Sequence, residues 1–252
     1  PWNFPLNLVF MPLSGVLAAG NRAMIKPSEF VPATSALLQR LIGQAFDASE
    51  VSVIPGDADV AQRFTALPFD HLVFTGSTAV GRHVMRAAAA NLVPVTLELG
   101  GKCPVIVSRS ADVAATAQVI AQHKLFNAGQ ICLAPDYVLV QRGDADRLVT
   151  AMIEAARTMY PDVATSPDLT TIINERHYAR LRAIVDDARE RGARVDEVNP
   201  TGASPESLAA VRRMPLTILR GVTDDMLAMQ EEIFGPVLPI VEVDGIDGAI
   251  AY

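Results

Sequence analysis

Residues 71–101, HLVFTGSTAVGRHVMRAAAANLVPVTLELGG, contain the alternation of elements that decides the fold. The apolar run His71 to Thr75 predicts a strand, Gly76-Ser77-Thr78 predicts a turn, and the alanine-rich run Val80 to Asn91 predicts a helix. A second apolar run, Val93 to Leu99, predicts another strand, which ends at a double glycine. Strand, helix and strand in this order predict a βαβ unit, in which the two strands are parallel.

The same alternation continues on both sides of this unit, without an internal repeat. Before it, the pattern predicts the helix Ala33–Phe46, the strand Val51–Ile54 and the helix Val60–Ala66. After it, the predicted strands are Val105–Val107, Tyr137–Gln141, Leu216–Val222 and Val237–Val243, and the predicted helices are Asp112–Phe126, Asp144–Met159, Asn174–Arg191 and Asp224–Glu231. We therefore expect an α/β fold with a domain boundary at Gly100-Gly101, because this is the only double glycine and strands flank it on both sides.

The composition excludes several classes of protein. The chain has 252 residues, of which 50% are apolar, and a net charge of −7. It therefore has enough apolar material for one large domain or two modest ones, and it is neither disordered nor fibrous. The acidic balance, without a block rich in Lys or Arg, argues against nucleic acid as a partner. The most apolar stretch, Leu8 to Gly20, is shorter than the roughly 20 residues that span a bilayer, so no membrane partner is expected for this segment.

The cysteines and histidines give no sign of a metal site. Two cysteines, Cys103 and Cys132, can form neither a disulfide framework nor a thiolate zinc cluster, which favours a reducing cytoplasm. The four histidines are scattered, and no His-Glu-x-x-His, Gly-x-Ser-x-Gly or EF-hand pattern occurs. The sequence therefore predicts no bound metal and no serine-hydrolase site.

Two short segments could carry chemistry. Gly76 and Gly81 at the start of a helix could place backbone amides around a phosphate. By itself this is weak evidence, because glycines needed only for a tight turn and close helix packing explain the segment somewhat better. Cys132 follows a turn, where a thiolate near backbone amides could act as a nucleophile. The alternative is a buried, small apolar cysteine, the interpretation that we keep for Cys103.

Glu98 is unusual because it interrupts an apolar strand. A buried carboxylate there would be costly unless it faced a cleft or a partner. Simple alternation, with Glu98 on a solvent-facing side of the strand, explains it about as well.

Six segments, taken together and in this order, resemble the aldehyde dehydrogenase superfamily: Pro1-Trp2-Asn3-Phe4-Pro5, Lys26-Pro27-Ser28-Glu29, Phe74-Thr75-Gly76-Ser77-Thr78 with Gly81, Leu97-Glu98-Leu99-Gly100-Gly101-Lys102, Asn127-Ala128-Gly129-Gln130-Ile131-Cys132 and Glu231-Glu232-Ile233-Phe234-Gly235-Pro236. The resemblance covers the chain from Pro1 to about Val243. Residues 132–137 and 229–231 are similar to the branch that contains class 3 enzymes and bacterial coniferyl aldehyde dehydrogenases. The fold implied is a partial, Rossmann-like parallel-sheet cofactor domain over residues 1–101, followed by a partial α/β catalytic domain over residues 102–252.

The resemblance implies a catalytic role for three residues. Cys132 matches the nucleophile that attacks the aldehyde carbon and forms a thiohemiacetal, which hydride loss converts to a thioester. Asn3 matches the side chain that, with the backbone N–H of Cys132, stabilises the oxyanion. Glu98 matches the general base that activates water for hydrolysis of the thioester. The implied activity is oxidation of an aldehyde to a carboxylic acid.

The resemblance also implies a nicotinamide cofactor. Lys26 and Glu29 match contacts to the adenosine ribose, and Glu232 and Phe234 match contacts to the nicotinamide ribose and ring. The whole implied set of cofactor contacts is Trp2, Lys26, Ser28, Glu29, Gly56, Gly76, Ser77, Gly81, Leu99, Gly100, Glu232 and Phe234. A carboxylate at Glu29 suits ribose hydroxyls and would repel a 2′-phosphate, so NAD is favoured, with NADP as the alternative.

Two other functions remain as alternatives: a CoA-acylating aldehyde dehydrogenase, and a non-catalytic fragment that only binds nucleotide. Relatives of the first kind commonly lack the carboxylate at Glu98, and a decayed site usually loses one of its catalytic residues. The substrate implied is an aromatic aldehyde such as coniferaldehyde, or a medium-chain apolar aldehyde, and the parent enzyme is expected to be a homodimer or homotetramer. Both ends are expected to be cut from a longer protein, so that this chain alone should fold poorly or aggregate.

Overall fold

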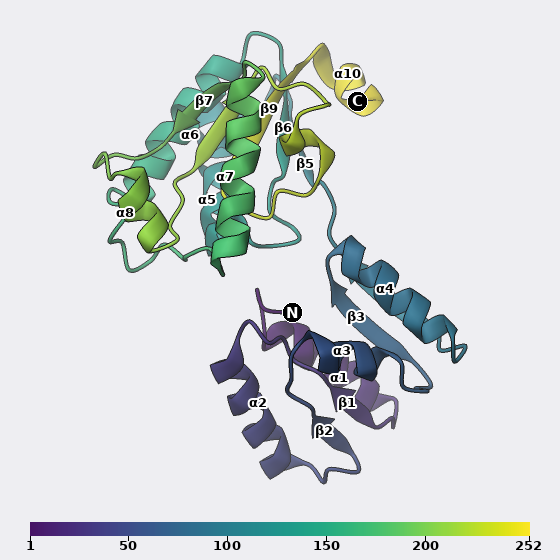
Figure 1. The fold of residues 1–252 in the computed structure, drawn as a ribbon. Coiled ribbons are helices and arrows are strands. Elements are labelled where there is room, and N and C mark those ends of the chain that lie inside the picture. Colours follow the sequence, from purple (N-terminus) through teal and green to yellow (C-terminus); the bar gives the residue numbers. More distant parts are fainter. The chain divides into compact units, whose positions relative to one another are not determined.

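The computed structural model describes residues 1–252. The chain divides into two compact units, an N-terminal unit from Pro1 to Gly100 and a C-terminal unit from Gly101 to Tyr252 (Figure 1). The sequence placed the boundary one residue later, between Gly101 and Lys102.

The N-terminal unit alternates helices and short strands. Its elements are α1 (Asn7–Ala18), β1 (Ala23–Ile25), α2 (Pro32–Ala45), β2 (Val51–Val53), α3 (Ala58–Thr65), β3 (Leu72–Gly76), α4 (Thr78–Ala89) and β4 (Val95–Leu99). The strands form two separate pairs, β1 with β2 and β3 with β4, and both pairs are parallel. The predicted βαβ unit is thereby confirmed, with α4 as the crossover between β3 and β4.

Each strand pair has its own small core. Around β1 and β2 the buried residues are Leu13, Leu38, Ile42, Val51 and Val53. Around β3 and β4 they are Leu72, Val84, Ala88 and Val93, so one face of α4 covers the second pair. Ser77 caps the N-terminus of α4, because its hydroxyl accepts a hydrogen bond from the backbone N–H of Val80 at 3.4 Å and so satisfies one donor of the first turn.

The C-terminal unit is built on one sheet of five strands. Its elements are β5 (Pro104–Val107), α5 (Val113–Leu125), the 3₁₀ turn η1 (Phe126–Gly129), β6 (Tyr137–Gln141), α6 (Ala145–Met159), α7 (Glu175–Glu190), β7 (Arg194–Glu197), α8 (Pro205–Ala210), β8 (Thr217–Arg220), α9 (Leu227–Gln230), β9 (Val237–Val243) and α10 (Gly245–Ala251). The strand order is β5-β6-β9-β8-β7, and only β7 is antiparallel to its neighbour.

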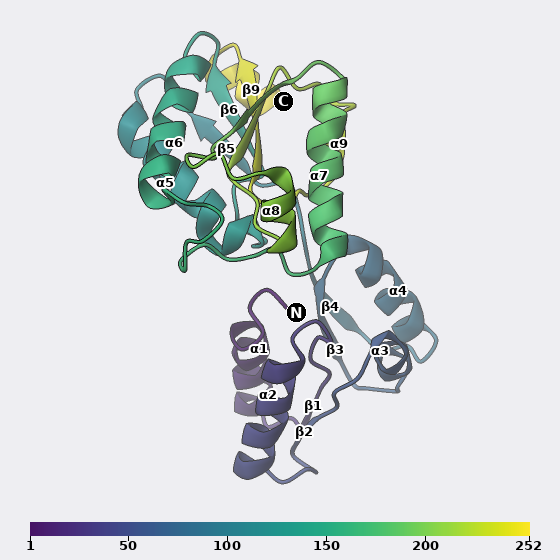
Figure 2. The same ribbon diagram turned by 60° about the vertical axis from the view of Figure 1, so that its left-hand side comes forward.

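Helices cover both faces of this sheet. Figures 1 and 2 show α5 and α6 on one face and α7 on the other. Successive residues of a strand point to opposite faces, so Ile218 of β8 packs with the core under α5 and α6, and Leu219 packs with the core under α7. A sheet buried on both sides explains why the sequence of β9 is almost continuously apolar.

Helix α7 begins after a capping asparagine and ends before a glycine. The side chain of Asn174 accepts a hydrogen bond from the N–H of His177 at 2.9 Å, which caps the N-terminus. Gly192, which follows the helix, has φ +91°, and the N–H groups of Gly192 and Ala193 donate to the carbonyls of Arg189 and Ala188. This pair of bonds is a Schellman motif.

The predicted strands Tyr137–Gln141 and Val237–Val243 are confirmed residue for residue. The sequence patterns did not predict α1, β1, β7 or α8. Helix α1 contains Pro12 and few polar residues, so its pattern shows no clear polar face. Strand β7 is largely charged, because it lies at the edge of the sheet beside β8.

No helix in the chain combines the length and the apolar composition that crossing a membrane requires.

Candidate functional site

Cys132 follows a turn of unusual backbone geometry. After α5 ends at Leu125, Asn127, Ala128 and Gly129 have φ values of +50°, +53° and +71°. Non-glycine residues rarely adopt this left-handed conformation, and they keep it only where the surroundings impose it. Cys132 lies at an exposed position after this turn.

Gln130 is the side chain that holds this turn. It is 2% exposed, and its amide nitrogen donates to the carbonyls of Asn127 at 3.0 Å and Thr171 at 3.1 Å. Its amide oxygen accepts from the N–H of Ile173 at 2.9 Å. One hydrogen bond of this buried amide thus closes the turn, and the other two fix the turn to the segment before α7. The sequence analysis had not assigned this role to Gln130.

Gly129 brings a second predicted motif beside the turn. A Cβ atom at Gly129 would lie 2.4 Å from the carbonyl oxygen of Gly235, so only glycine allows the two backbones to approach this closely. A Cβ atom at Gly235 would in turn lie 2.3 Å from a methyl group of Leu181 on α7. The turn before Cys132 and the segment 231–235 are therefore packed against each other.

A buried ion pair anchors the segment 231–235. The Asp136 side chain is almost fully buried and pairs with the ammonium of Lys102. Its other carboxylate oxygen accepts from the N–H of Ile233 at 2.9 Å. Lys102 also donates to the carbonyls of Ala228 at 2.9 Å and Glu231 at 3.1 Å. Each charge thus has several partners, as a buried pair needs.

Arg180 of α7 holds the same segment from another side. Its guanidinium donates to the carbonyl of Glu232 at 3.3 Å and to that of Ile233. These contacts fix the backbone that carries the side chains of Glu232 and Phe234. Phe234 has the left-handed φ of +52°.

Glu232 has the feature expected of a residue that binds a hydroxyl group. Its carboxylate oxygen Oε1 is buried and has no hydrogen-bond partner. Burial raises the pKa of the Glu232 carboxyl, a backbone hydrogen bond from Gly101 partly opposes this, and the Asp136 carboxylate raises it further. A buried acceptor without a donor is costly, so a ribose hydroxyl donating to this oxygen fits the site. The contacts of Glu232 and Phe234 with a nicotinamide nucleoside remain predictions.

Lys124 is a buried cation that the sequence analysis missed. It is 1% exposed, and its ammonium donates to the carbonyl of Pro135 at 2.7 Å. Burial lowers the pKa of Lys124 to about 8, although the Asp136 carboxylate opposes this shift. A signal was present in the sequence, because Lys124 shares the buried face of α5 with Ala117 and Ala121 at helical spacing.

Cys103 is not the fully buried apolar cysteine that was predicted. It is half-buried, and its thiol donates to the carbonyl oxygen of Cys132 at 3.2 Å. Burial raises the pKa of the Cys103 thiol, and the carboxylates of Asp136 and Glu232 raise it further. The C-terminal unit thus brings Cys103, Cys132 and Glu232 into one neighbourhood.

In the N-terminal unit, three glycines that are predicted to contact the cofactor lie close to neighbouring side chains. A Cβ atom at Gly81 would lie 2.7 Å from a methyl group of Leu99, so Gly81 lets α4 approach β4. A Cβ atom at Gly76 would lie 2.5 Å from the ring of Phe74, and one at Gly56 would lie 2.6 Å from the side chain of Val60. Their contact with a pyrophosphate remains a prediction.

Glu98 lies on the exposed side of β4. Burial alternates along this strand, with Thr96 and Glu98 exposed and Val95, Leu97 and Leu99 half-buried. Of the two explanations offered for a carboxylate in this strand, the structure supports alternation. Glu98 is therefore available to a reaction without the cost of a buried charge.

The predicted ribose contacts form a local cluster after β1. The ammonium of Lys26 pairs with the carboxylate of Glu29 at 2.9 Å. Burial alone would raise the pKa of the Glu29 carboxyl, but a backbone hydrogen bond and the hydrogen bond from Lys26 hold it below its usual value. The Ser28 carbonyl accepts from the hydroxyl of Ser35 at 3.0 Å, which ties this segment to α2. An ionised Glu29 fits ribose hydroxyls as partners.

The other predicted residues of this unit lie at its ends. Trp2 and Asn3 are half-buried and precede α1, and Gly100 is half-buried after β4.

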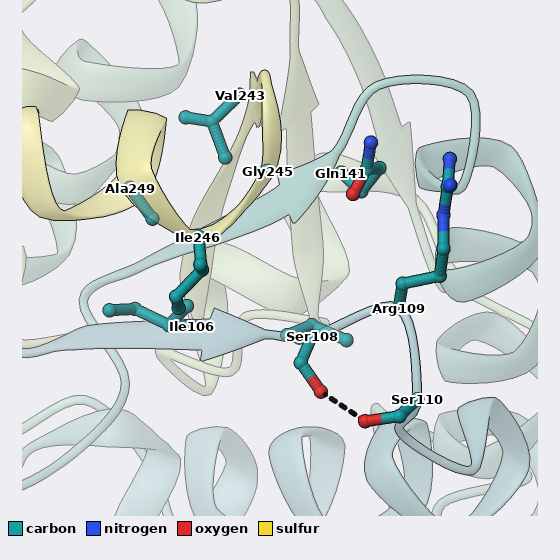
Figure 3. A pocket seen from close by; sticks show the side chains of 10 residues that line it. Ile106, Ser108, Arg109, Ser110, Gln141, Val243, Gly245, Ile246 and Ala249 are labelled. Carbon is teal, nitrogen blue, oxygen red and sulfur yellow. Dashed lines mark hydrogen bonds between the residues drawn. The ribbon is translucent and has the colours of Figure 1, made fainter.

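A separate cavity of about 450 Å³ lies in the C-terminal unit between the end of β5 and α10, and it contains none of the predicted site residues (Figure 3). Its lining includes Ile106, Ser108, Ser110, Gln141, Val243 and Ile246.

Known proteins provide an independent comparison. The chain is 55% identical over 252 residues to a protein of Caulobacter vibrioides described as a probable coniferyl aldehyde dehydrogenase, and 54% identical to the coniferyl aldehyde dehydrogenase of a Pseudomonas species. Both alignments cover 100% of this chain and 52% of the relative, so the chain spans about half the length of the curated relatives it matches.

Solved structures agree with these relatives. The substrate-bound AldH of Staphylococcus aureus matches with a TM-score of 0.91 and 43% identity, over 100% of this chain and 53% of that one. The aldehyde dehydrogenase of Mycobacterium tuberculosis complexed with NAD+ matches with a TM-score of 0.88 and 33% identity, over 100% and 52%. The model of the aldehyde dehydrogenase family matches residues 1–252. The chain belongs to the aldehyde dehydrogenase family.

Proposed function

We propose that the protein containing this chain oxidises an aldehyde to a carboxylic acid, with Cys132 as the nucleophile and NAD as the hydride acceptor. The observation that carries the proposal is the C-terminal unit's arrangement of an exposed cysteine on a turn fixed by Gln130, with Gly129 packed against the segment of Glu232 and Phe234. We assign cofactor binding to residues 1–101 and the nucleophile to residues 102–252.

Cys132 adds to the carbonyl carbon of the aldehyde and forms a thiohemiacetal, which becomes a thioester when hydride is lost. Asn3 and the backbone N–H of Cys132 donate to the oxyanion, and such a donor lowers a barrier by about 2.7–4 kcal/mol. Glu98 then takes a proton from the water that hydrolyses the thioester. Its exposed position on β4 makes it accessible to water.

NAD, when bound, supplies the acceptor for the hydride. Glu232 would accept a hydrogen bond from the nicotinamide ribose through its unpartnered Oε1, and Phe234 would contact the ring. Lys26 and Glu29 would contact the adenosine ribose, and the amides after Gly76 would face the pyrophosphate. The ionised carboxylate of Glu29 favours NAD over NADP, because it would repel a 2′-phosphate.

We propose an aromatic aldehyde of the coniferaldehyde type as substrate, on the basis of the names of the two bacterial relatives at 55% and 54% identity. A homodimer or homotetramer in the cytoplasm is part of the same proposal. Phe126, which is 60% exposed and lies at the start of the turn before Cys132, is a candidate apolar wall for such a substrate.

The decisive experiment measures NADH formation by the full-length protein with coniferaldehyde. Replacing the nucleophile in Cys132→Ala should lower kcat on the order of 10^4-fold or more. Cys103→Ala is the matched control and should keep most of the activity, because Cys103 only donates to a backbone carbonyl. Equal activity of the Cys132→Ala variant and the parent protein would refute the proposal.

The reaction product shows whether the acyl group of the thioester is transferred to water or to CoA. Glu98→Gln should give a burst of about one NADH per active site followed by slow turnover, because the thioester accumulates without its base. Formation of acyl-CoA instead of free acid, when CoA is added to the parent protein, would favour the CoA-acylating alternative.

A further inference from the structure

The two cysteines of this chain are close together in the C-terminal unit, although 29 positions separate them. The Sγ atom of Cys103 lies 3.2 Å from the carbonyl oxygen of Cys132. Standard bond lengths then place that sulfur within about 5.6 Å of the Cα atom of Cys132. The Cα atoms of a disulfide lie about 4.4–6.8 Å apart. The bond can therefore form once the Cys132 side chain rotates toward this sulfur and the backbone of Cys132 moves to bring the two Cα atoms into that range.

The local backbone can supply this adjustment. Cys132 and Leu133 are the central residues of a turn closed by a 3.1 Å hydrogen bond from the N–H of Ala134 to the carbonyl of Ile131. Both are exposed, with Leu133 at 81%, so no packed core resists a movement of their side chains. Cys103 directly precedes β5, whose register with β6 is fixed, so it provides a stationary partner.

The two thiols differ in accessibility. Cys132 is exposed and meets solutes first, whereas Cys103 is half-buried. The groups that face Cys103 are the carboxylates of Asp136 and Glu232 and the ammonium of Lys124. Burial raises the pKa of the Cys103 thiol, the two carboxylates raise it further, and the Lys124 ammonium partly opposes the rise. Cys103 is therefore poorly placed to react with an oxidant itself and well placed to react with an oxidised Cys132.

We propose that Cys103 is a resolving cysteine, which forms a reversible disulfide with Cys132 when a hydroperoxide oxidises Cys132. The Cys132 thiolate attacks one oxygen of hydrogen peroxide, the O–O bond breaks, and a sulfenic acid and hydroxide form; the hydroxide takes up a proton and leaves as water. The Cys103 sulfur then attacks the Cys132 sulfur, the S–O bond breaks, and the departing hydroxide leaves as water with the proton of the Cys103 thiol. Two thiols are oxidised and one peroxide is reduced.

The consequence for catalysis rests on the proposed function of Cys132. The disulfide would block the nucleophile reversibly and prevent its irreversible oxidation to sulfinic and sulfonic acids. Formation of the bond itself does not depend on any activity, so it can be tested separately.

The test treats the full-length protein with hydrogen peroxide, blocks free thiols by alkylation and maps tryptic peptides by mass spectrometry. Cleavage after Lys102, Arg109, Lys124 and Arg142 gives peptides 103–109 and 125–142, each with one cysteine. We expect these two peptides joined, two hydrogen atoms lighter than their separate sum, and separated again by dithiothreitol. Cys132 as sulfinic acid without this joined peptide, or a disulfide between two molecules, would overturn the proposal.

Cys103→Ser is the matched variant, because a hydroxyl still donates to the Cys132 carbonyl but cannot form the bond. After peroxide and then dithiothreitol, we expect about fivefold less alkylatable Cys132 in this variant than in the parent protein. Equal recovery in both would overturn the proposal. Cys103→Ala serves if the serine variant melts at a lower temperature. A protein that shows the joined peptide but never oxidises an aldehyde would refute the proposed function and leave the disulfide intact.

Discussion

The two units of this chain differ in how firmly they hold their candidate residues. The C-terminal unit has one five-stranded sheet with buried clusters of twenty and fourteen residues on its two faces. The N-terminal unit has two strand pairs with clusters of only five and four. Two-stranded sheets are marginal by themselves. The comparison teaches that the cysteine turn is positioned by a completed core, whereas Lys26, Glu29 and Glu98 lie on lightly buried elements.

The ion pairs should show this difference most strongly. Asp136→Ala should destabilise the C-terminal unit by about 3–5 kcal/mol, because it leaves Lys102 and the N–H of Ile233 without their buried partner. Glu29→Gln should cost less than about 1 kcal/mol, since Glu29 is 37% exposed. Hydrogen exchange followed by mass spectrometry measures both effects and locates them. Equal losses in the two variants would contradict the comparison.

Glycine substitutions should give the next largest effect. Gly129→Ala should cost about 3 kcal/mol, because its Cβ would meet the Gly235 backbone and its φ is +71°. Gly76→Ala meets only the far end of the Phe74 ring, which can rotate away, so its cost should stay below about 1 kcal/mol. Urea unfolding of the two variants measures the difference, and a larger loss for Gly76→Ala would show that the packing argument is wrong.

Lys124 should make stability depend on pH. Burial lowers the pKa of Lys124 in the folded chain to about 8, below the 10.5 usual for a lysine, so the unfolded chain binds more protons between these values. Stability should therefore rise by about 2 kcal/mol as the pH rises from 8 to 10.5. Lys124→Met should remove this rise, and urea unfolding at several pH values measures it. An unchanged slope in the variant would assign the pH dependence to other groups.

The helix caps should show the smallest contrast. Asn174→Ala in the C-terminal unit should cost about 1 kcal/mol, because the side chain accepts from the N–H of His177 at 2.9 Å. Ser77→Ala in the N-terminal unit should cost about 0.5 kcal/mol, since its hydrogen bond is longer, at 3.4 Å. Thermal unfolding of both variants, with the parent protein as control, measures these costs. The reverse order would show that cap geometry does not decide them.

Local patterns were sufficient for most of the fold. The spacing of apolar residues and the residues that begin and end elements predicted the strand at Tyr137–Gln141 and both ends of α7. These signals depend on residues that are close in sequence. Strand β7 was not predicted, because its pairing with β8 joins residues 20 to 26 positions apart and needs no apolar pattern. Helix α1 was not predicted, because an apolar run with a proline inside shows no helical spacing of apolar and polar residues.

For the candidate site, the sequence by itself identified Cys132, Glu232 and Phe234 as motif residues, since each motif is a short contiguous run. Only the tertiary structure decided that Gly129 packs on Gly235, because that contact joins two backbones more than a hundred residues apart. The same holds for the hydrogen bond from Cys103 to Cys132 and for the burial of Lys124. Residue type and spacing determine local conformation, but burial and close approach depend on how the whole sheet packs.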